Sequence, residues 1–226
     1  MPEISIVLPV DDGVAALAGV IDAYGDALRA IGEPFEILLV AEAGSSAASA
    51  CAALADARDE VRVADGGGAW GRAVRAGLRA ATGEVLCYTN WERTPAEALD
   101  LMLRYALRNP DVVFRANRRT RDTRLQRLGS LLFNLECRAV LRATAWDVNG
   151  TPKVFSRART KLLELTRDDG LIDAEFAWTC DRESYSVVEI PIEAPSVLGR
   201  SSTPDYAAAL RMYTGLLGLR RQARTP

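Results

Sequence analysis

Short β-rich runs alternate along the chain with longer segments whose apolar residues recur at helical spacing. The β-rich runs 4–10, 35–40, 61–64 and 85–88 are followed by the helical segments 14–31, 45–58, 69–81 and 96–108. Apolar runs bounded by glycine and proline predict strands, and a period near 3.6 residues predicts helices. Strands that alternate with helices favour a parallel sheet with right-handed crossovers. The pattern therefore predicts an α/β fold with a mostly parallel central sheet.

The stretch 83–95, GEVLCYTNWERTP, marks the middle of this sheet. The uninterrupted apolar run Val85–Tyr88 predicts a strand covered on both faces, and Pro95 is well placed to open the next helix. Asn90 and Glu92 follow the carboxyl end of that strand. Ligands of open α/β sheets bind in the crevice at this edge. We therefore expect the chemistry of the protein here.

The pattern changes after residue 110. We expect a strand at 111–114, an arginine-dense segment at 115–142 that ends in an apolar helix, a helix to about Thr166, a helix start near 171–175, a strand at 186–190, and an amphipathic helix from about Asp205. These elements predict one domain over residues 1–203 and a C-terminal helical extension over 204–226.

Composition narrows the functional classes. A net charge of −2 gives no nucleic-acid signature. Histidine is absent, which excludes Ser/His and Cys/His nucleophilic machinery and histidine-ligated metal sites, so acid–base work falls to carboxylates, Tyr, Lys or the substrate. The four cysteines stand singly, which indicates neither a zinc site nor a disulfide framework. With no leader pattern and no apolar run of membrane-spanning length, we expect a cytoplasmic protein.

Several sequence blocks occur in an order that resembles a known family. They are VLPV near the start, GAWGRAVRAGLRAATGEVL, the turn after the central strand, DVNGTPKVFSR and LIDAEF. The arrangement resembles family 2 glycosyltransferases, and more closely the branch that transfers sugars to dolichyl or polyprenyl phosphate. The resemblance spans roughly Ile4 to Ser202. It implies a GT-A fold, which is a Rossmann-like three-layer sandwich, a nucleotide-sugar donor carrying UDP or GDP, and transfer with inversion.

The resemblance also implies a set of donor-binding residues. In that family, the end of the first strand contacts the base and the end of the second strand contacts the ribose. The start of the helix after the third strand contacts the diphosphate through free backbone N–H groups. A plain glycine turn into a helix is the alternative reading of that last feature. The implied residues are Pro9, Val10, Asp11, Glu42, Gly71, Arg72, Asn90, Trp91, Lys153 as a phosphate contact, and Arg200 and Ser201 in a late basic loop.

Asn90 and Glu92 stand where the family has Asp-x-Asp, so the resemblance implies that they hold Mg or Mn. Asn90 offers an oxygen but no charge, which weakens the expected metal site. Ala41 and Glu42 likewise stand where the family has paired aspartates. Two interpretations follow: a transferase with an altered donor site, or a catalytically silent homologue that acts as a binding or partner-assembly module.

Asp173 and Glu175 match the acidic residues that the family places near the acceptor, and either is a candidate general base. Amino-terminal helix capping by Asp173 is the structural alternative. If the acceptor is a lipid phosphate such as polyprenyl phosphate, its oxygen is already anionic, and the carboxylate would orient it rather than deprotonate it. A small-molecule acceptor also stays open.

The arginine-dense segment and the terminal helix allow two interpretations. They suit peripheral contact with an anionic surface at the inner face of the membrane. They equally suit a solvated face with a helix packed on the domain or on a second subunit of a homodimer.

Overall fold

The structure is a computed structural model that describes residues 3–11, 14–119, 124–141, 144–193 and 215. Its described residues form one seven-stranded sheet in the order β3-β2-β1-β4-β6-β5-β7. The strands are β1 (Ile4–Pro9), β2 (Phe35–Ala41), β3 (Val61–Asp65), β4 (Val85–Tyr88), β5 (Val112–Arg118), β6 (Lys153–Ser156) and β7 (Ser186–Ile192). All neighbouring pairs are parallel except those made by β6, which runs antiparallel to β4 and β5. The predicted mostly parallel sheet is confirmed.

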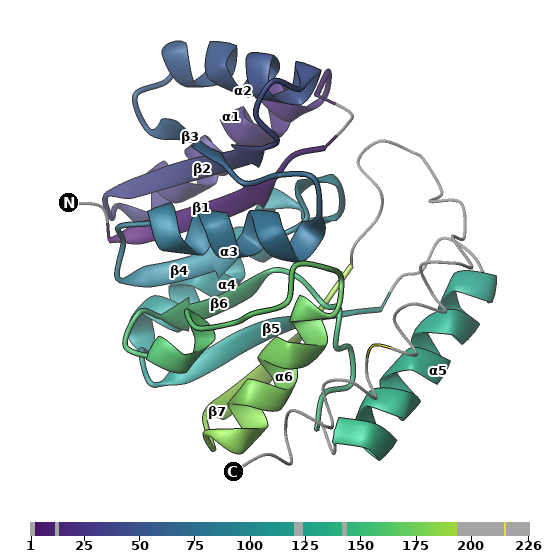
Figure 1. Cartoon of the computed structure of the whole chain (residues 1–226). Coiled ribbons are helices and arrows are strands. Elements are labelled where there is room, and N and C mark those ends of the chain that lie inside the picture. The colour runs from purple at the N-terminus through teal and green to yellow at the C-terminus, as the bar shows by residue number, and fades with distance from the viewer. Residues whose placement is uncertain (1–2, 12–13, 120–123, 142–143, 194–214, 216–226) are drawn as a thin grey trace.

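Helices cover both faces of the sheet and make three layers (Figure 1). The described helices are α1 (Leu17–Ile31), α2 (Ser46–Asp56), α3 (Trp70–Ala80), α4 (Ala96–Arg108), α5 (Arg124–Leu141) and α6 (Ile172–Arg182), with two short 3-10 turns, η1 (Trp91–Arg93) and η2 (Thr160–Leu162). One face carries α1, α2 and α4, and the other carries α3 and α6. Helix α5 lies outside these layers, against α6.

The two cores follow from side-chain alternation along the strands. On β1, Ile4, Ile6 and Leu8 enter the core under α1 and α4, whereas Val7 enters the core under α3 and α6. Strand β4 is fourth of the seven strands, and all four of its residues are buried. The prediction of a central strand covered on both sides is therefore confirmed, as is Pro95 at the start of α4.

A buried carboxylate links three parts of the core. Glu36 on β2 is 4% exposed and accepts hydrogen bonds from the Ser5 hydroxyl at 2.7 Å and from the Thr82 backbone N–H at 2.7 Å. Arg62 on β3 pairs with its second oxygen at 2.6 Å. Burial raises the pKa of Glu36, but these hydrogen bonds outweigh burial and hold the pKa below its usual range. Glu36 therefore fastens β1, β3 and the turn before β4 to β2.

Two expectations for the second half of the chain need correction. The helix expected up to Thr166 is wrong, because only the turn η2 forms there and the chain continues as a loop to α6. Leu162 and Leu165 do enter the core, but the amides of Thr166 and Arg167 bond to the Glu175 side chain rather than to a helix. Strand β6 was not anticipated within DVNGTPKVFSR.

The expected strand at 111–114 runs on to Arg118, because β7 pairs along its whole length. The C-terminal amphipathic helix and the boundary at 203/204 lie outside the described residues.

Candidate functional site

The carboxyl ends of β1, β2 and β4 lie side by side, because these strands are parallel neighbours. Pro9 ends β1 and Val10 follows it, both with buried side chains, and the Val10 N–H donates to the Val40 carbonyl at 2.8 Å. Asp11 follows them and is exposed. Of the three residues expected to meet a nucleotide base, only Asp11 therefore presents its side chain at the edge.

Glu42, at the end of β2, packs against the glycine turn that follows β3. A Cβ on Gly67 would lie 2.1 Å from the Glu42 backbone nitrogen, so only glycine fits. Gly68 has φ +86°, and a Cβ there would lie 3.2 Å from Glu42 Oε1. The Ala43 N–H donates to Asp65 Oδ1 at 3.1 Å and fixes the end of β2 to the end of β3. The exposed Glu42 carboxylate is thereby held over the turn that leads into α3.

The residues after β4 form the tight turn η1. Asn90 Oδ1 accepts a hydrogen bond from the Glu92 N–H at 2.9 Å, which caps the turn. The turn directs Trp91 inward, where it is 2% exposed and belongs to the core that α1 and α4 cover. Trp91 was expected to touch the donor; its side chain packs in the core instead.

The donor set expected for Mg or Mn does not fit a tightly held ion. Asn90 uses its carbonyl oxygen to cap η1, and Glu92 adds the one carboxylate of the pair. Hard divalent cations favour several oxygen ligands with charge among them. Within the part of the chain that the structure describes, no three Cys, Asp or Glu side chains gather closely enough to hold a metal. The assignment of a metal to Asn90 and Glu92 stays a prediction, with a weaker donor set than two carboxylates would give.

The start of α3 packs against the loop at 166–169. A Cβ on Gly71 would lie 2.5 Å from the Arg167 carbonyl oxygen, so glycine allows this backbone contact. The Arg72 N–H donates to the Asp168 carbonyl at 3.0 Å. This amide was expected to be free for a diphosphate; the loop already uses it. The Arg72 side chain is exposed and remains available to a ligand.

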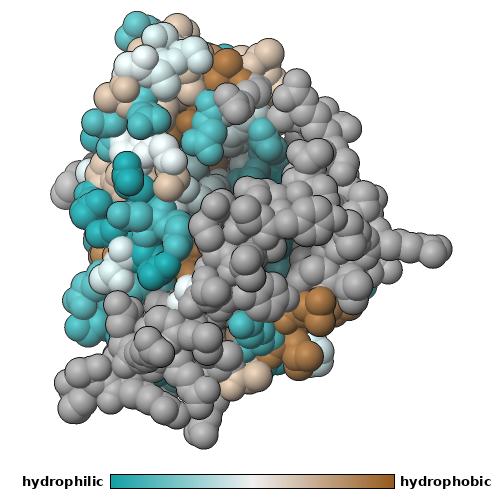
Figure 2. Space-filling view, turned by 45° about the vertical axis from the view of Figure 1, so that its right-hand side comes forward, coloured by the Kyte–Doolittle hydropathy of each residue, from teal (hydrophilic) through white to brown (hydrophobic). Residues whose placement is uncertain are grey.

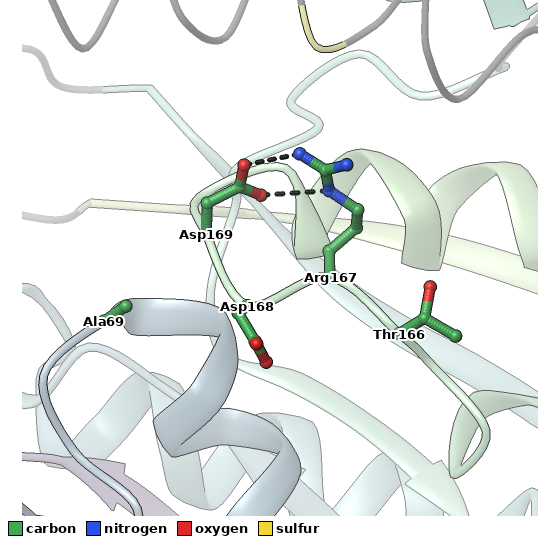
Figure 3. Close-up of a pocket in the computed structure, with 5 residues that line it drawn as sticks. All are labelled: Ala69, Thr166, Arg167, Asp168 and Asp169. Carbon is green, nitrogen blue, oxygen red and sulfur yellow. Dashed lines mark hydrogen bonds and ion pairs between the residues drawn. The ribbon is translucent and has the colours of Figure 1, made fainter.

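A cavity of about 490 Å³ opens between this helix start and the loop, lined by Ala69, Thr166, Arg167, Asp168 and Asp169 (Figure 3). Arg167 and Asp169 point toward each other across its rim and form an ion pair. Asp168 points to the other side, toward α3, and pairs with Arg75. Each lining carboxylate thus has a guanidinium partner, so the wall is polar without a large net charge.

The side chain of Glu175 holds the same loop in place through hydrogen bonds. It is 7% exposed and accepts hydrogen bonds from the Thr166 N–H at 3.0 Å, the Thr166 hydroxyl at 2.7 Å and the Arg167 N–H at 2.9 Å. As placed, Glu175 positions the loop, and its expected role as a base stays a prediction.

Asp173 lies at the centre of a buried polar cluster. Its Oδ1 accepts from the Tyr88 hydroxyl at 2.9 Å and pairs with the ammonium of Lys153, and its Oδ2 accepts from Trp70 Nε1 at 3.1 Å. Lys153 is 0% exposed and lies over the rings of Tyr88 and Phe176. Burial lowers the pKa of Lys153, while Asp173 opposes that shift. Burial also raises the pKa of Tyr88 well above its usual value.

The strand register explains this gathering. Tyr88 on β4 is paired with Lys153 on β6, and Lys153 with Arg115 on β5. Lys153 was expected to contact phosphate, but its ammonium faces the interior and is paired with Asp173 there. Trp70 and Tyr88 were not singled out from the sequence. Two sequence features could have indicated these residues: a tyrosine at the end of an apolar run, and a tryptophan at the start of a helix.

Two further ion pairs order the segments beside this cluster. Arg118 forms a two-point contact with Asp147, at 2.9 and 3.0 Å. Arg115 pairs with Glu189 at 2.8 Å and is 3% exposed. The start of the DVNGTPKVF block is thus anchored to the end of β5. Arg200 and Ser201, expected in a late basic loop, lie outside the described residues.

None of the described helices is long and apolar enough to cross a membrane.

No model of a known protein family matches the chain, and no curated protein matches its sequence. Among solved structures, the fold is similar to glucosyl-3-phosphoglycerate synthase from Mycobacterium tuberculosis in complex with Mn²⁺, uridine diphosphate and phosphoglyceric acid, with a TM-score of 0.74 and 15% identity over 97% of this chain and 78% of that one. The same enzyme with Mn²⁺, UDP-glucose and glycerol 3-phosphate gives 0.71 and 15% over 97% and 80%. A mycobacterial protein gives 0.74 and 15% over 97% and 74%. At this identity the likeness shows the fold, and we conclude that the chain has the GT-A-like fold of these structures.

Proposed function

We propose that the protein is a glycosyltransferase that takes a sugar from a nucleoside-diphosphate donor bound at the carboxyl ends of β1, β2 and β4. The observation that carries the proposal is the likeness of nearly the whole chain to an enzyme solved with UDP and with UDP-glucose. The position of Trp91 supports it, because its side chain packs in the core and is therefore not placed over the end of β4. UDP and GDP are the nucleotides we propose.

In this proposal Asp11 and Glu42 hold the nucleoside and the exposed Arg72 contacts the diphosphate. Both carboxylates are exposed at the strand ends, as contacts to base and ribose require. A guanidinium forms charge-assisted hydrogen bonds to phosphate oxygens. Arg200 and Ser201 are proposed to add to this contact. In the transfer the acceptor oxygen attacks the anomeric carbon as its bond to the diphosphate breaks, which inverts the configuration and releases the nucleoside diphosphate.

We further propose an acceptor whose attacking oxygen is already anionic. Asp173 and Glu175, the two candidate bases, each hold three hydrogen-bond donors within the protein. A general base needs free access to the proton that it removes. Phosphate acceptors need none, and polyprenyl phosphate or a small phosphorylated molecule would both suffice.

One observation favours the second candidate, a silent homologue that binds without turnover. The Asn90 carbonyl oxygen accepts a hydrogen bond within η1 and carries no charge. The strand end therefore offers one carboxylate, that of Glu92, where a metal-assisted transferase uses two. Such a protein would keep the crevice and lose the chemistry.

A transfer assay separates the two candidates. The full chain is incubated with radiolabelled UDP-glucose or GDP-mannose and with polyprenyl phosphate, glycerol 3-phosphate or glycerol. The transferase predicts labelled product with a phosphate acceptor and none with glycerol, and Arg72→Gln should reduce its rate at least about tenfold, the loss of one charge-assisted phosphate contact. Arg79→Gln, an exposed arginine two turns along α3, is the matched control. Donor binding without product from any acceptor would favour the silent homologue.

A further inference from the structure

Trp70 is the member of the buried polar cluster that reaches the surface. The side chains of Tyr88 and Lys153 in this cluster are fully buried and Asp173 is 5% exposed, whereas Trp70 is partly exposed. Trp70 opens α3 directly after Ala69, which lines the cavity. Trp70 therefore links the buried cluster to the wall of the cavity.

The indole ring of Trp70 is held by packing on two sides. It lies on the inner side of α3, where Val74 and Gly77 follow at spacings of four and three, and packs on the core that α3 and α6 cover. It also meets the Tyr88 ring edge to face, with 6.4 Å between the ring centres. Its Nε1 donates to Asp173 Oδ2 at 3.1 Å. Because the ring is fixed, this hydrogen bond fixes the direction of the carboxylate.

The carboxylate of Asp173 has room for one further hydrogen bond. An ionised carboxylate offers about four acceptor positions. Lys153 and Tyr88 both contact Oδ1, and among the residues that the structure describes only Trp70 contacts Oδ2. The side chain of Asp173 is 7% exposed, so it is not sealed from a ligand. One position on Oδ2 is therefore left for a hydrogen-bond donor, and Trp70 determines where that position points.

The surroundings favour a ligand with hydroxyl groups. The cavity wall contributes the Thr166 hydroxyl and the carboxylates of Asp168 and Asp169, each of which is paired with a guanidinium. Figure 2 shows that most of the described surface on one side of the molecule is hydrophilic. A hydroxyl donates to a carboxylate without bringing a charge that would compete with these ion pairs. A sugar has this chemistry.

We propose that Trp70 is a positioning residue for sugar recognition. Its indole N–H holds Asp173 so that the open position of Oδ2 accepts a hydrogen bond from a hydroxyl of the sugar that the nucleotide carries. The inference rests on the proposed function, which places the diphosphate at Arg72 in the same first turn of α3. Trp70 acts through Asp173 and not by touching the sugar. Binding of the nucleotide without its sugar is therefore independent of Trp70.

Isothermal titration of the full chain with UDP and UDP-glucose, and with GDP and GDP-mannose, tests the inference. Trp70→Phe keeps a ring against Tyr88 and removes the indole N–H. It should weaken binding of the nucleotide-sugar at least about tenfold, which corresponds to the loss of one hydrogen bond to a charged group. Binding of the nucleotide alone should not change, which also shows that the variant is folded.

Trp178→Phe is the matched control. Trp178 is also a partly exposed tryptophan, and on α6 its ring lies 4.5 Å from the guanidinium of Arg182. This variant should bind nucleotide and nucleotide-sugar as the wild type does.

A double-mutant cycle shows whether Trp70 acts through Asp173. The background K153M/D173L removes the carboxylate together with the cation that would otherwise be left buried and unpaired. In this background Trp70→Phe should change the affinity for the nucleotide-sugar by less than about twofold, because the group that Trp70 positions is absent.

Three results would overturn the inference and leave the transferase proposal intact. They are nucleotide-sugar binding by Trp70→Phe that equals or exceeds that of the wild type, an equal loss for nucleotide and nucleotide-sugar, and additive losses in the cycle. If the wild type bound none of the four ligands, the proposed function itself would fail, and the inference with it.

Discussion

The ammonium of Lys153 on β6 forms an ion pair with the carboxylate of Asp173 on α6, and both side chains are buried, at 0% and 5% exposure. Tyr88 and Trp70 donate to the same carboxylate. One acidic group thus joins β4, β6, α3 and α6 at the edge where the proposed donor crevice lies. The antiparallel course of β6 makes this geometry, because it brings Lys153 level with the end of β4.

Replacing Lys153 alone should be strongly destabilising. Lys153→Met leaves a buried carboxylate without its cation, which costs about 3–5 kcal/mol of unfolding free energy. The double variant K153M/D173L should recover much of that loss. Urea denaturation measures all three proteins, with Lys161→Met as control because Lys161 is an exposed partner of Glu164. A Lys153→Met protein within about 1 kcal/mol of wild type would contradict a structural role for the pair.

Gly71→Ala should loosen the contact between α3 and the loop at 166–169. The new methyl group would meet backbone atoms that cannot rotate away, at a cost of about 1–3 kcal/mol. Gly19→Ala is the opposite case, because a Cβ at this position in the first turn of α1 meets nothing within 4 Å. It should stabilise the protein by about 0.5–1 kcal/mol. Thermal unfolding measures the stability of both variants. If both changed stability equally and in the same direction, the contact between Gly71 and the loop would be refuted.

Glu175→Gln should free the loop that forms the cavity wall. The new amide group faces N–H donors and loses a charged acceptor, which costs about 1.5–3 kcal/mol. Hydrogen exchange should accelerate at the amides of Thr166 and Arg167, whose acceptor is Glu175. Glu164→Gln, at an exposed carboxylate, should leave those amides unchanged. Unaltered protection in the Glu175 variant would show that another group holds the loop.

Glu36 should make the protein acid-sensitive. Because its pKa is lower in the folded than in the unfolded state, the folded protein binds fewer protons. Its stabilisation is complete above the unfolded pKa and disappears as pH falls through the folded value. Denaturant unfolding from about pH 6 to about pH 3 should show this loss, and Glu36→Gln should flatten the slope while lowering stability at neutral pH. An equally steep slope in the variant would assign the acid sensitivity to other carboxyls.

Much of the fold could be predicted because its signals are local. Val85–Tyr88 is an apolar run with clear ends, and Ser45 caps α2 by accepting from the Ala48 N–H, as its sequence position indicates. The loop at 166–169 could not be predicted in the same way. Its conformation depends on Glu175, nine residues from Thr166, and on the distant Gly71.

The candidate site was predicted less fully, because side-chain direction depends on tertiary packing. The sequence places Asn90, Trp91 and Glu92 at a strand end, but η1 turns Trp91 into the core. Lys153 resembles a phosphate ligand in sequence and is a buried ion-pair partner in space. Asp11, Glu42 and Arg72 remain predicted donor contacts with side chains exposed at the edge.

Isothermal titration of the full chain with UDP, GDP and their sugars, in EDTA and then in Mn²⁺, tests the central claim most directly. A donor crevice between β1, β2 and β4 predicts saturable binding of one nucleotide. Gly68→Val should weaken this binding at least about tenfold, because Gly68 has φ +86° and the new side chain would lie against Glu42. The exposed Val63→Thr on the outer strand β3 should bind as the wild type does. Absence of binding for every nucleotide with and without Mn²⁺, or undiminished binding by Gly68→Val, would contradict the account.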